Sequence, residues 1–241
     1  MPALAGLSPA GPASIAGVTV AACILAASPD SALREVDGTP NVRRLVDLAW
    51  AGGAMPVIVV VPDPDGAVAA ALAGAPVVLG VPAPFELGPA GQMSRAIDLA
   101  LAEVDATDAA LLWPARMGWL DAETVTSLIE AHGTDRGTLL RPAFRGEAGW
   151  PILVPVGNLA ALRALPADLM PPAISDALAV ATPSRTVELG DPGIVLGLDT
   201  PRDDLPPFEG PPEPAAGHRH EWGAAAAAGP DEAPARPATR G

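Results

Sequence analysis

The sequence predicts an α/β fold with a mostly parallel sheet, and two observations carry that prediction. Short runs of apolar, largely β-branched residues alternate along the chain with longer segments of helical character. The apolar runs are apolar throughout, which indicates strands buried on both faces and joined by helical crossovers. Strands are expected at residues 18–26, 56–61, 76–79, 109–113, 138–140, 149–154 and 186–189, and helices at 42–51, 67–72, 93–104, 122–132 and 158–165.

Residues with capping preferences mark the starts of two of these helices. Thr39 followed by Pro40 is predicted to supply the N-cap and the first turn of the helix at 42–51. Asp121 is predicted to cap the helix at 122–132. Both assignments follow from the preference of small polar side chains for the N-cap position.

The charge of the chain excludes two classes of partner. All 14 basic residues are arginine, and 28 acidic residues bring the formal net charge to −14. A nucleic-acid groove needs surplus cations and an anionic membrane repels such a chain, so neither partner is expected. No run of about 18 apolar residues free of Pro, Gly and charge occurs. Cys23 is the sole cysteine, which excludes an intramolecular disulfide and fits a reducing cytoplasm.

Composition divides the chain into three regions. Residues 1–16 lack Lys and Arg and are expected to form a flexible leader, and residues 17–205 to form one domain. Residues 206–241 are rich in Pro, Ala, Gly and charge, which is typical of a disordered tail. His218 and His220 in this tail resemble a metal-binding pair, although histidines in such segments more often titrate in solvent.

A ligand of an open α/β sheet binds outside the carboxyl ends of the strands, which here are the segments after Ala27, after Leu79, after Trp113 and around Asp199. Seven short stretches of the chain carry a resemblance. They are residues 24–27, 37–44, 57–61, 91–94, 120–125, 142–151 and 198–203. In order and spacing they resemble the molybdenum-cofactor nucleotidyltransferase-like (MobA-like NTP transferase) family, over about residues 18–205. The resemblance implies a Rossmann-like, three-layer α/β/α domain that transfers a nucleotidyl group from an NTP. It also implies a set of nucleotide-binding residues: Ala26, Ala27, Ser28, Arg34, Gly91 and Ser94.

The phosphate-binding loop of the family departs from its pattern here. Family members carry L-A-A-G and then R-M-G-x-x-K, in which backbone amides and a lysine hold the phosphates. This sequence has Ser28 in place of the glycine, followed by Pro29, which lacks an N–H group, and it contains no lysine. Arg34 is the cation that could replace the lysine, with a different reach and geometry.

The metal-binding aspartate of the family, in a D-x-P pattern after the fourth strand, corresponds to Arg116, with Gly118 at the proline. A guanidinium cannot ligate a divalent cation and repels it. The family's G-H-P element reads Gly-Trp-Pro, with Trp150 in place of the histidine. Its D-x-D-T-P-x-D element keeps most of its pattern but has Gly197 at the first aspartate; the retained residues are Asp199, Thr200, Pro201 and Asp203.

These departures favour a degenerate, non-catalytic member of the family that needs no cofactor and binds or regulates an unknown protein partner or small molecule. Arg116, Arg145 and Trp150 would then line the acceptor side. A related interpretation has Arg116, Arg141 and Arg145 clamp a carboxylate or phosphate. Trp113, Trp119 and Trp150 either fill the vacated site with apolar surface or belong to the core.

The alternative is an active transferase with a rearranged site. It would move a cytidylyl or guanylyl group from CTP or GTP to a molybdopterin-type or other phosphorylated acceptor. Arg34, Arg43 and Arg44 would contact the phosphates, and Asp199 with Asp203 would hold Mg²⁺. Arg34 and Asp199 are therefore the candidates for catalytic residues.

Overall fold

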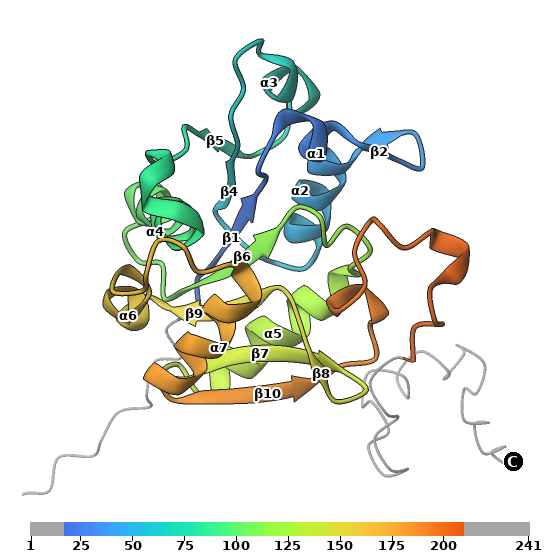
Figure 1. Ribbon diagram of the computed structural model, residues 1–241. Coiled ribbons are helices and arrows are strands. Elements are labelled where there is room, and N and C mark those ends of the chain that lie inside the picture. Colours follow the sequence, from blue (N-terminus) through green and yellow to red (C-terminus); the bar gives the residue numbers. More distant parts are fainter. Residues whose placement is uncertain (1–16, 210–241) are drawn as a thin grey trace, which may run out of the picture. The chain divides into compact units, whose positions relative to one another are not determined.

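The computed structural model describes residues 17–209, and the predicted apolar runs form the strands of one sheet (Figure 1). Strands β10, β7, β9, β6, β1, β4 and β5 lie in that order, and β8 (Glu147–Ala148) pairs with β7. The bounds are β1 Val20–Leu25, β4 Val57–Val60, β5 Val78–Gly80, β6 Ala109–Pro114, β7 Leu139–Phe144, β9 Ile152–Pro155 and β10 Ser184–Glu188.

The sheet is mostly parallel, as predicted. Along that order every neighbouring pair is parallel except those of β9, which runs antiparallel to both β6 and β7. The other six strands therefore point the same way, and their carboxyl ends meet at one edge of the sheet. We call this edge the carboxyl edge, and it is where open α/β sheets bind their ligands.

Helices cover both faces of the sheet and complete three layers (Figure 1). Helix α2 (Asn41–Ala51) packs against β1 and β4 and contacts α5 (Ala122–Thr134). Helix α4 (Gly88–Glu103) packs against β1 and β4 and contacts α6 (Leu159–Arg163) and α7 (Pro171–Ala181). The central strands β1, β4, β6 and β9 are buried almost throughout, which confirms the burial on both faces that their continuous apolar sequences predict.

The remaining elements are short. Helices α1 (Pro29–Leu33) and α3 (Ala67–Ala71) have one to two turns each. The 3-10 helices within residues 17–209 are η1 (Phe85–Leu87), η2 (Val156–Asn158), η3 (Pro192–Ile194) and η4 (Arg202–Asp204). No helix in this described part is long and apolar enough to cross a membrane. The predicted leader, and the predicted tail beyond residue 209 with His218 and His220, lie outside the described residues.

One predicted cap is wrong and one is confirmed. Thr39 and Pro40 form a strand, β3, that pairs with β2 (Glu35–Val36) around a turn with positive φ at Asp37 and Gly38. Helix α2 therefore begins at Asn41 without a side-chain cap, because Thr39 is held in the hairpin. The Asp121 side chain accepts a hydrogen bond from the Glu123 amide and caps α5 as predicted.

Candidate functional site at the carboxyl edge

The segments that follow β1 and β6 lie side by side at the carboxyl edge. The Ala115 amide donates to the Leu25 carbonyl (2.8 Å), so the two strands remain paired to their ends. Ala26, Ala27 and Ser28 follow β1, and Arg116 follows β6. The structure thus brings the predicted phosphate-loop residues next to the turn that carries Arg116, whose correspondence to the family's metal-binding aspartate stays a prediction.

The loop after β1 is a short turn into α1. Ser28 is the N-cap of this helix, its Oγ accepts from the Ser31 amide (3.3 Å), and Pro29 is the first helical residue. The helix ends at Leu33, and Arg34 is its C-cap. The hydroxyl of Ser28 is therefore used within the turn, and proline stands where a donor amide would otherwise begin the helix.

The turn after β6 is fixed by hydrogen bonds from distant parts of the chain. Each backbone carbonyl from Ala115 to Gly118 accepts a bond from a different residue. The donors, in order, are Asn41 Nδ2 (2.7 Å), the Leu198 amide (2.8 Å), Trp113 Nε1 (2.9 Å) and Arg44 Nη1. The backbone of the turn is therefore rigidly positioned, whereas the side chain of Arg116 is exposed.

Asn41 connects this turn to the loop after β1. Asn41 is fully buried. Its backbone amide donates to the Arg34 carbonyl (2.9 Å), and its side-chain amide donates to the Ala115 carbonyl. Its Oδ1 has no hydrogen-bond partner among the described residues and lies 2.6 Å from where a Cβ at Gly118 would stand. The motif comparison did not single out Asn41, because an asparagine before a helix is an ordinary sequence feature.

Residues 197–204 lie against both segments. Arg34 Nη1 is 3.4 Å from Asp199 Oδ1, so the two candidate catalytic residues are adjacent in space. Trp119 Nε1 donates to the Thr200 carbonyl (3.0 Å), and Arg202 pairs with Asp37 in the β2–β3 hairpin. Asp203 is exposed in η4. Ion pairs and hydrogen bonds therefore hold residues 197–204 against the segments that follow β1 and β6.

The residues present do not fit a divalent metal ion. Arg116, the residue predicted to replace the family's metal-binding aspartate, is a cation, and the carboxylate of Asp199 pairs with Arg34. Within residues 17–209 no group of three or more His, Cys, Asp or Glu side chains could hold a metal. Two positive groups at this edge would repel an incoming cation.

The other arginines of the rearranged site are engaged elsewhere. Arg43 pairs with Asp47 (3.1 Å) and donates to the Ala73 carbonyl (3.2 Å). Arg44 donates to Gly118 and lies over the Trp119 ring, with its guanidinium carbon 5.9 Å from the ring centre. Burial, followed by the nearby Arg202, lowers the pKa of Arg44 from its ordinary value. Arg44 thus supports the turn after β6, whereas Arg43 bonds to its own helix and to the segment after α3.

The clamp predicted from Arg116, Arg141 and Arg145 is not formed. Arg141 pairs with Asp176 (2.6 Å), and Arg145 pairs with Glu209 and stacks on Phe144. Arg141 lies within β7 and Arg145 just after it, and four residues of extended strand span about 13 Å. Each guanidinium therefore binds a carboxylate of its own instead of converging on one ligand.

Two of the three tryptophans are core residues. Trp113 is fully buried, and Trp150 is 4% exposed. Trp119 is partly exposed beneath Arg44 and Thr200. The acceptor-side role of Trp150 stays a prediction, and its ring would need to become accessible to meet an acceptor.

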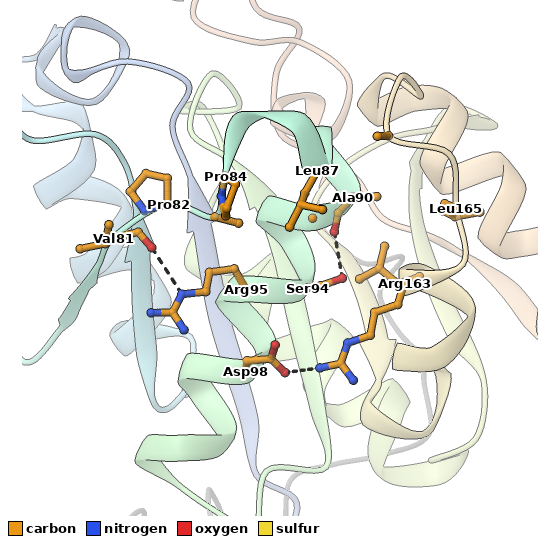
Figure 2. Close-up of a pocket in the computed structure, with 14 residues that line it drawn as sticks. Val81, Pro82, Pro84, Leu87, Ala90, Ser94, Arg95, Asp98, Arg163 and Leu165 are labelled. Atoms are coloured by element: carbon orange, nitrogen blue, oxygen red, sulfur yellow. Dashed lines mark hydrogen bonds and ion pairs between the residues drawn. The ribbon is translucent and has the colours of Figure 1, made fainter.

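Gly91 and Ser94 lie on α4, where they line a pocket of about 610 Å³ (Figure 2). Figure 2 shows Pro82 and Pro84 on one side of the helix and Leu165 on the other. The Ser94 hydroxyl donates to the Ala90 carbonyl (2.9 Å), and an Asp98–Arg163 ion pair (2.5 Å) lies further along the helix. The walls are mostly apolar residues, and the nucleotide-binding role of Gly91 and Ser94 stays a prediction.

Asp191 is a buried residue that sequence reasoning missed. Its carboxylate accepts from the Thr124 hydroxyl (2.6 Å), the Asp121 amide (2.9 Å) and the Gly193 amide (2.8 Å). Burial, the largest influence, raises the pKa of Asp191 above its ordinary value. These bonds hold η3 against the start of α5. Asp191 therefore fixes the position of the first turn of α5, which follows the turn that carries Arg116.

Comparison with known proteins identifies the family. The model of the MobA-like NTP transferase domain matches residues 27–182. No curated protein sequence matches the chain.

Solved structures share the fold at low sequence identity. A nucleotidyl transferase from Methanothermobacter is 18% identical, with a TM-score of 0.59 and coverage of 76% of this chain and 93% of its own. Mycobacterium tuberculosis Rv0371c in complex with manganese is 17% identical, with a TM-score of 0.58 and coverage of 71% and 89%. The 4-diphosphocytidyl-2C-methyl-D-erythritol synthase of Anaerococcus prevotii is 12% identical, with a TM-score of 0.59 and coverage of 78% and 94%.

Proposed function

This chain belongs to the MobA-like NTP transferase domain family, and from that premise we propose that it uses the nucleotidyltransferase fold for binding and does not catalyse metal-dependent nucleotidyl transfer. Its role is to bind or regulate a protein partner or a small molecule in the cytoplasm. The single observation that supports this proposal is the position of Arg116 two residues after the end of β6.

Nucleotidyl transfer develops negative charge on phosphate oxygens, and enzymes neutralise that charge with metal ions and basic side chains. A unit positive charge about 4 Å from a divalent ion is repelled by about 8 kcal/mol at an effective dielectric constant near 20. A free carboxylate at the same distance would offset this repulsion, but Asp199 is already paired with Arg34. The charges at this edge therefore oppose metal binding.

The alternative function is an active transferase with a rearranged site, and one observation favours it. Arg34 and Asp199, its candidate catalytic residues, lie 3.4 Å apart. With CTP or GTP, Mg²⁺ would have to take Asp199 away from Arg34, and Arg34 would then turn to the phosphates. The acceptor would be a molybdopterin-type or other phosphorylated compound.

Isothermal titration calorimetry with CTP or GTP and Mg²⁺, together with an assay for pyrophosphate release, separates the two functions. The proposal expects neither Mg²⁺-dependent binding nor turnover by the full chain. Mg²⁺-dependent binding at micromolar concentration would contradict the proposal, and release of pyrophosphate would show that the chain is an enzyme. If Arg34→Ala and Asp199→Ala both left such binding unchanged, the rearranged site would be wrong as well.

The variant Arg116→Asp tests directly whether the charge of Arg116 opposes metal binding. It restores the carboxylate of the family pattern, and we expect it to bind Mn²⁺ more tightly than the wild type. Arg185→Asp makes the same charge change at the second residue of β10, near Ala131 at the end of α5, and is the matched control. Equal Mn²⁺ affinity in the two variants would remove the support that Arg116 gives to the proposal.

A further inference from the structure

We infer that the chain forms a symmetric dimer in which Phe85 of each copy enters the pocket beside α4 of the other copy, and Glu86 of each copy pairs with Arg95 of the other. This inference goes beyond the proposed function and does not depend on it.

Phe85 in η1 is a large aromatic side chain that the fold leaves in solvent. It is 92% exposed, and Val81 and Leu87, which line the pocket of Figure 2, are also exposed. An aromatic side chain removes about 150–250 Å² of surface from water when it is buried, and aromatic residues are enriched in the cores of interfaces. An exposed apolar patch of this kind is typical of a surface that binds another protein.

The segment that carries Phe85 is held in place by hydrogen bonds. The Ala83 amide donates to Gln92 Oε1 (2.8 Å), and Gln92 Nε2 donates to the Ala83 carbonyl (2.9 Å). The Leu87 amide donates to the Pro84 carbonyl (3.0 Å) and closes η1. A side chain on a segment that is already ordered loses less freedom on binding, so Phe85 is suited to anchor an interface.

The pocket lies on the same face of the domain as Phe85. Pro84 and Leu87, which flank η1 residues 85 and 86 in the sequence, line it, and Leu165 lies across α4 from Pro84 (Figure 2). Its volume is about 610 Å³, whereas an apolar cavity of about 150 Å³ already holds benzene, so a phenyl ring has room here. In a twofold dimer both copies present the same surface, and a ring beside a pocket on each copy lets each ring enter the opposite pocket.

The charges at the pocket complement Glu86, which is exposed next to the Phe85 ring. Asp98 and Arg163 at the pocket neutralise each other (2.5 Å). Arg95 also lines the pocket, and within residues 17–209 its guanidinium makes only a long hydrogen bond to a backbone carbonyl (3.4 Å) and no ion pair. When the ring of one copy enters the pocket of the other, Glu86 is carried to the positive charge of Arg95. This complementarity favours a second copy as the occupant.

The charge of the whole chain limits the affinity of the dimer. Each copy carries a net charge of −14, which opposes association. Salt at 0.15 M screens charges that are more than about 8 Å apart, so contacts within the interface decide its stability. We therefore expect a reversible dimer of micromolar affinity.

Dimer formation would also cover two residues of the predicted nucleotide site. Gly91 and Ser94 line the pocket that Phe85 of the second copy enters. A ligand that reaches these two residues would therefore have to compete with dimer formation.

Sedimentation velocity of the full chain at 0.15 M salt tests the inference. We expect the wild type to be dimeric at about 100 µM and to dissociate on dilution. Phe85→Ser should raise the dissociation constant about thirtyfold or more, because it removes the anchor of the interface. Val180→Ser is the matched control, since Val180 near the end of α7 is another apolar side chain in solvent (91% exposed), and it should leave the dimer unchanged.

Glu86→Arg and Arg95→Glu test the pairing between the copies. Each variant alone should be mostly monomeric, because like charges then meet across the interface. An equimolar mixture of the two variants should dimerise again, since one copy of each places opposite charges at both contacts. A purely structural effect of either substitution would not be repaired by mixing.

Four outcomes would overturn the inference. They are a wild type that stays monomeric at about 100 µM, a dimer that Phe85→Ser leaves intact, equal losses in Phe85→Ser and Val180→Ser, and a mixture of the two charge variants that remains monomeric. None of these outcomes involves Mg²⁺-dependent nucleotidyl transfer, so the proposed function would stand in each case.

Discussion

The side-chain amide of Asn41 donates a 2.7 Å hydrogen bond to the carbonyl oxygen of Ala115, 74 residues further along the chain. This bond joins the start of α2 to the turn that carries Arg116. Both residues are buried, so the bond has no competition from water. The position of Arg116 at the carboxyl edge thus depends on a buried residue at the start of α2.

Replacement of Asn41 tests this connection. Asn41→Ala should lower the free energy of unfolding by about 1–2 kcal/mol, because the Ala115 carbonyl loses its donor. Asn41→Asp should be more destabilising than Asn41→Ala, because it buries a carboxylate oxygen against that carbonyl. Urea unfolding curves of the three proteins measure the difference. An aspartate variant as stable as the alanine variant would contradict the described hydrogen bond.

Gly118 should not tolerate a side chain. A Cβ at this position would lie 2.6 Å from Asn41 Oδ1 and 2.7 Å from Leu198 Cδ2. Gly118→Ala should therefore cost about 1–3 kcal/mol through overpacking. Gly137→Ala is the matched control, since a Cβ there meets nothing within 4 Å, and it should be neutral or slightly stabilising. Thermal unfolding of both variants compares the two, and equal melting temperatures would contradict the packing.

The Arg34–Asp199 ion pair should contribute little to stability. A double-mutant cycle with Arg34→Gln and Asp199→Asn should give a coupling energy below about 1 kcal/mol, and 1 M salt should reduce it further. Denaturant unfolding of the wild type, the two single variants and the double variant gives the four free energies of unfolding for each cycle. One cycle is measured at low salt and one at 1 M salt. A coupling well above this range would mean that the pair is structural, and that Arg34 is not free to leave Asp199 for a ligand.

His132 should make the fold sensitive to acid. The side chain is buried in α5, neither ring nitrogen has a hydrogen-bond partner among the described residues, and burial lowers its pKa from 6.5. Arg136 lowers the pKa further, and Asp108 and Asp135 oppose these effects. Below pH 6.5 the unfolded chain takes up a proton at His132 while the folded chain does not, so the free energy of unfolding falls as the pH falls.

The variant His132→Leu isolates this effect. It removes the titrating group and two unsatisfied nitrogens, so its stability relative to wild type should rise as the pH is lowered from 7 towards 5. Histidines outside α5 are present in both proteins and cancel in the difference. A pH-independent difference in the free energy of unfolding would show that His132 is protonated equally in the folded and unfolded chains.

Cys23 should report global unfolding. It is the sole cysteine of the sequence, it is fully buried in β1, and burial raises the pKa of its thiol. Since the thiolate is the reactive form, the native protein should react with Ellman's reagent only as fast as it unfolds. The denatured chain should release one equivalent of the chromophore at once. Rapid reaction of the native protein would mean that β1 opens locally at the centre of the sheet.

The sequence predicted the elements of the sheet well, because a strand buried on both faces needs an apolar residue at nearly every position. Helix α7 escaped notice, since its Pro171 and Pro172 resemble a break although proline is acceptable in a first helical turn. The hairpin of β2 and β3 was also missed, and with it the true start of α2. Two-residue strands leave too short a pattern for periodicity to detect.

The candidate site was predictable only in part. The residues that replace the family's motif positions could be read from the sequence, since they follow identifiable strand ends. The pairing of Arg34 with Asp199 could not, because 165 residues separate them and only the closed fold brings them together. Asn41 and Asp191 were missed for the same reason, since their importance lies in the distant backbone groups that they bond.

The close packing of Gly118 against Asn41 also limits which substitutions this turn can accept during evolution. A return to the family's D-x-P pattern would require proline at position 118, where Asn41 and Leu198 leave no room for its ring. Gly118→Pro made alone should therefore give a less stable protein, and smaller side chains at positions 41 and 198 would reduce that loss. We therefore expect positions 41, 118 and 198 to covary among homologues.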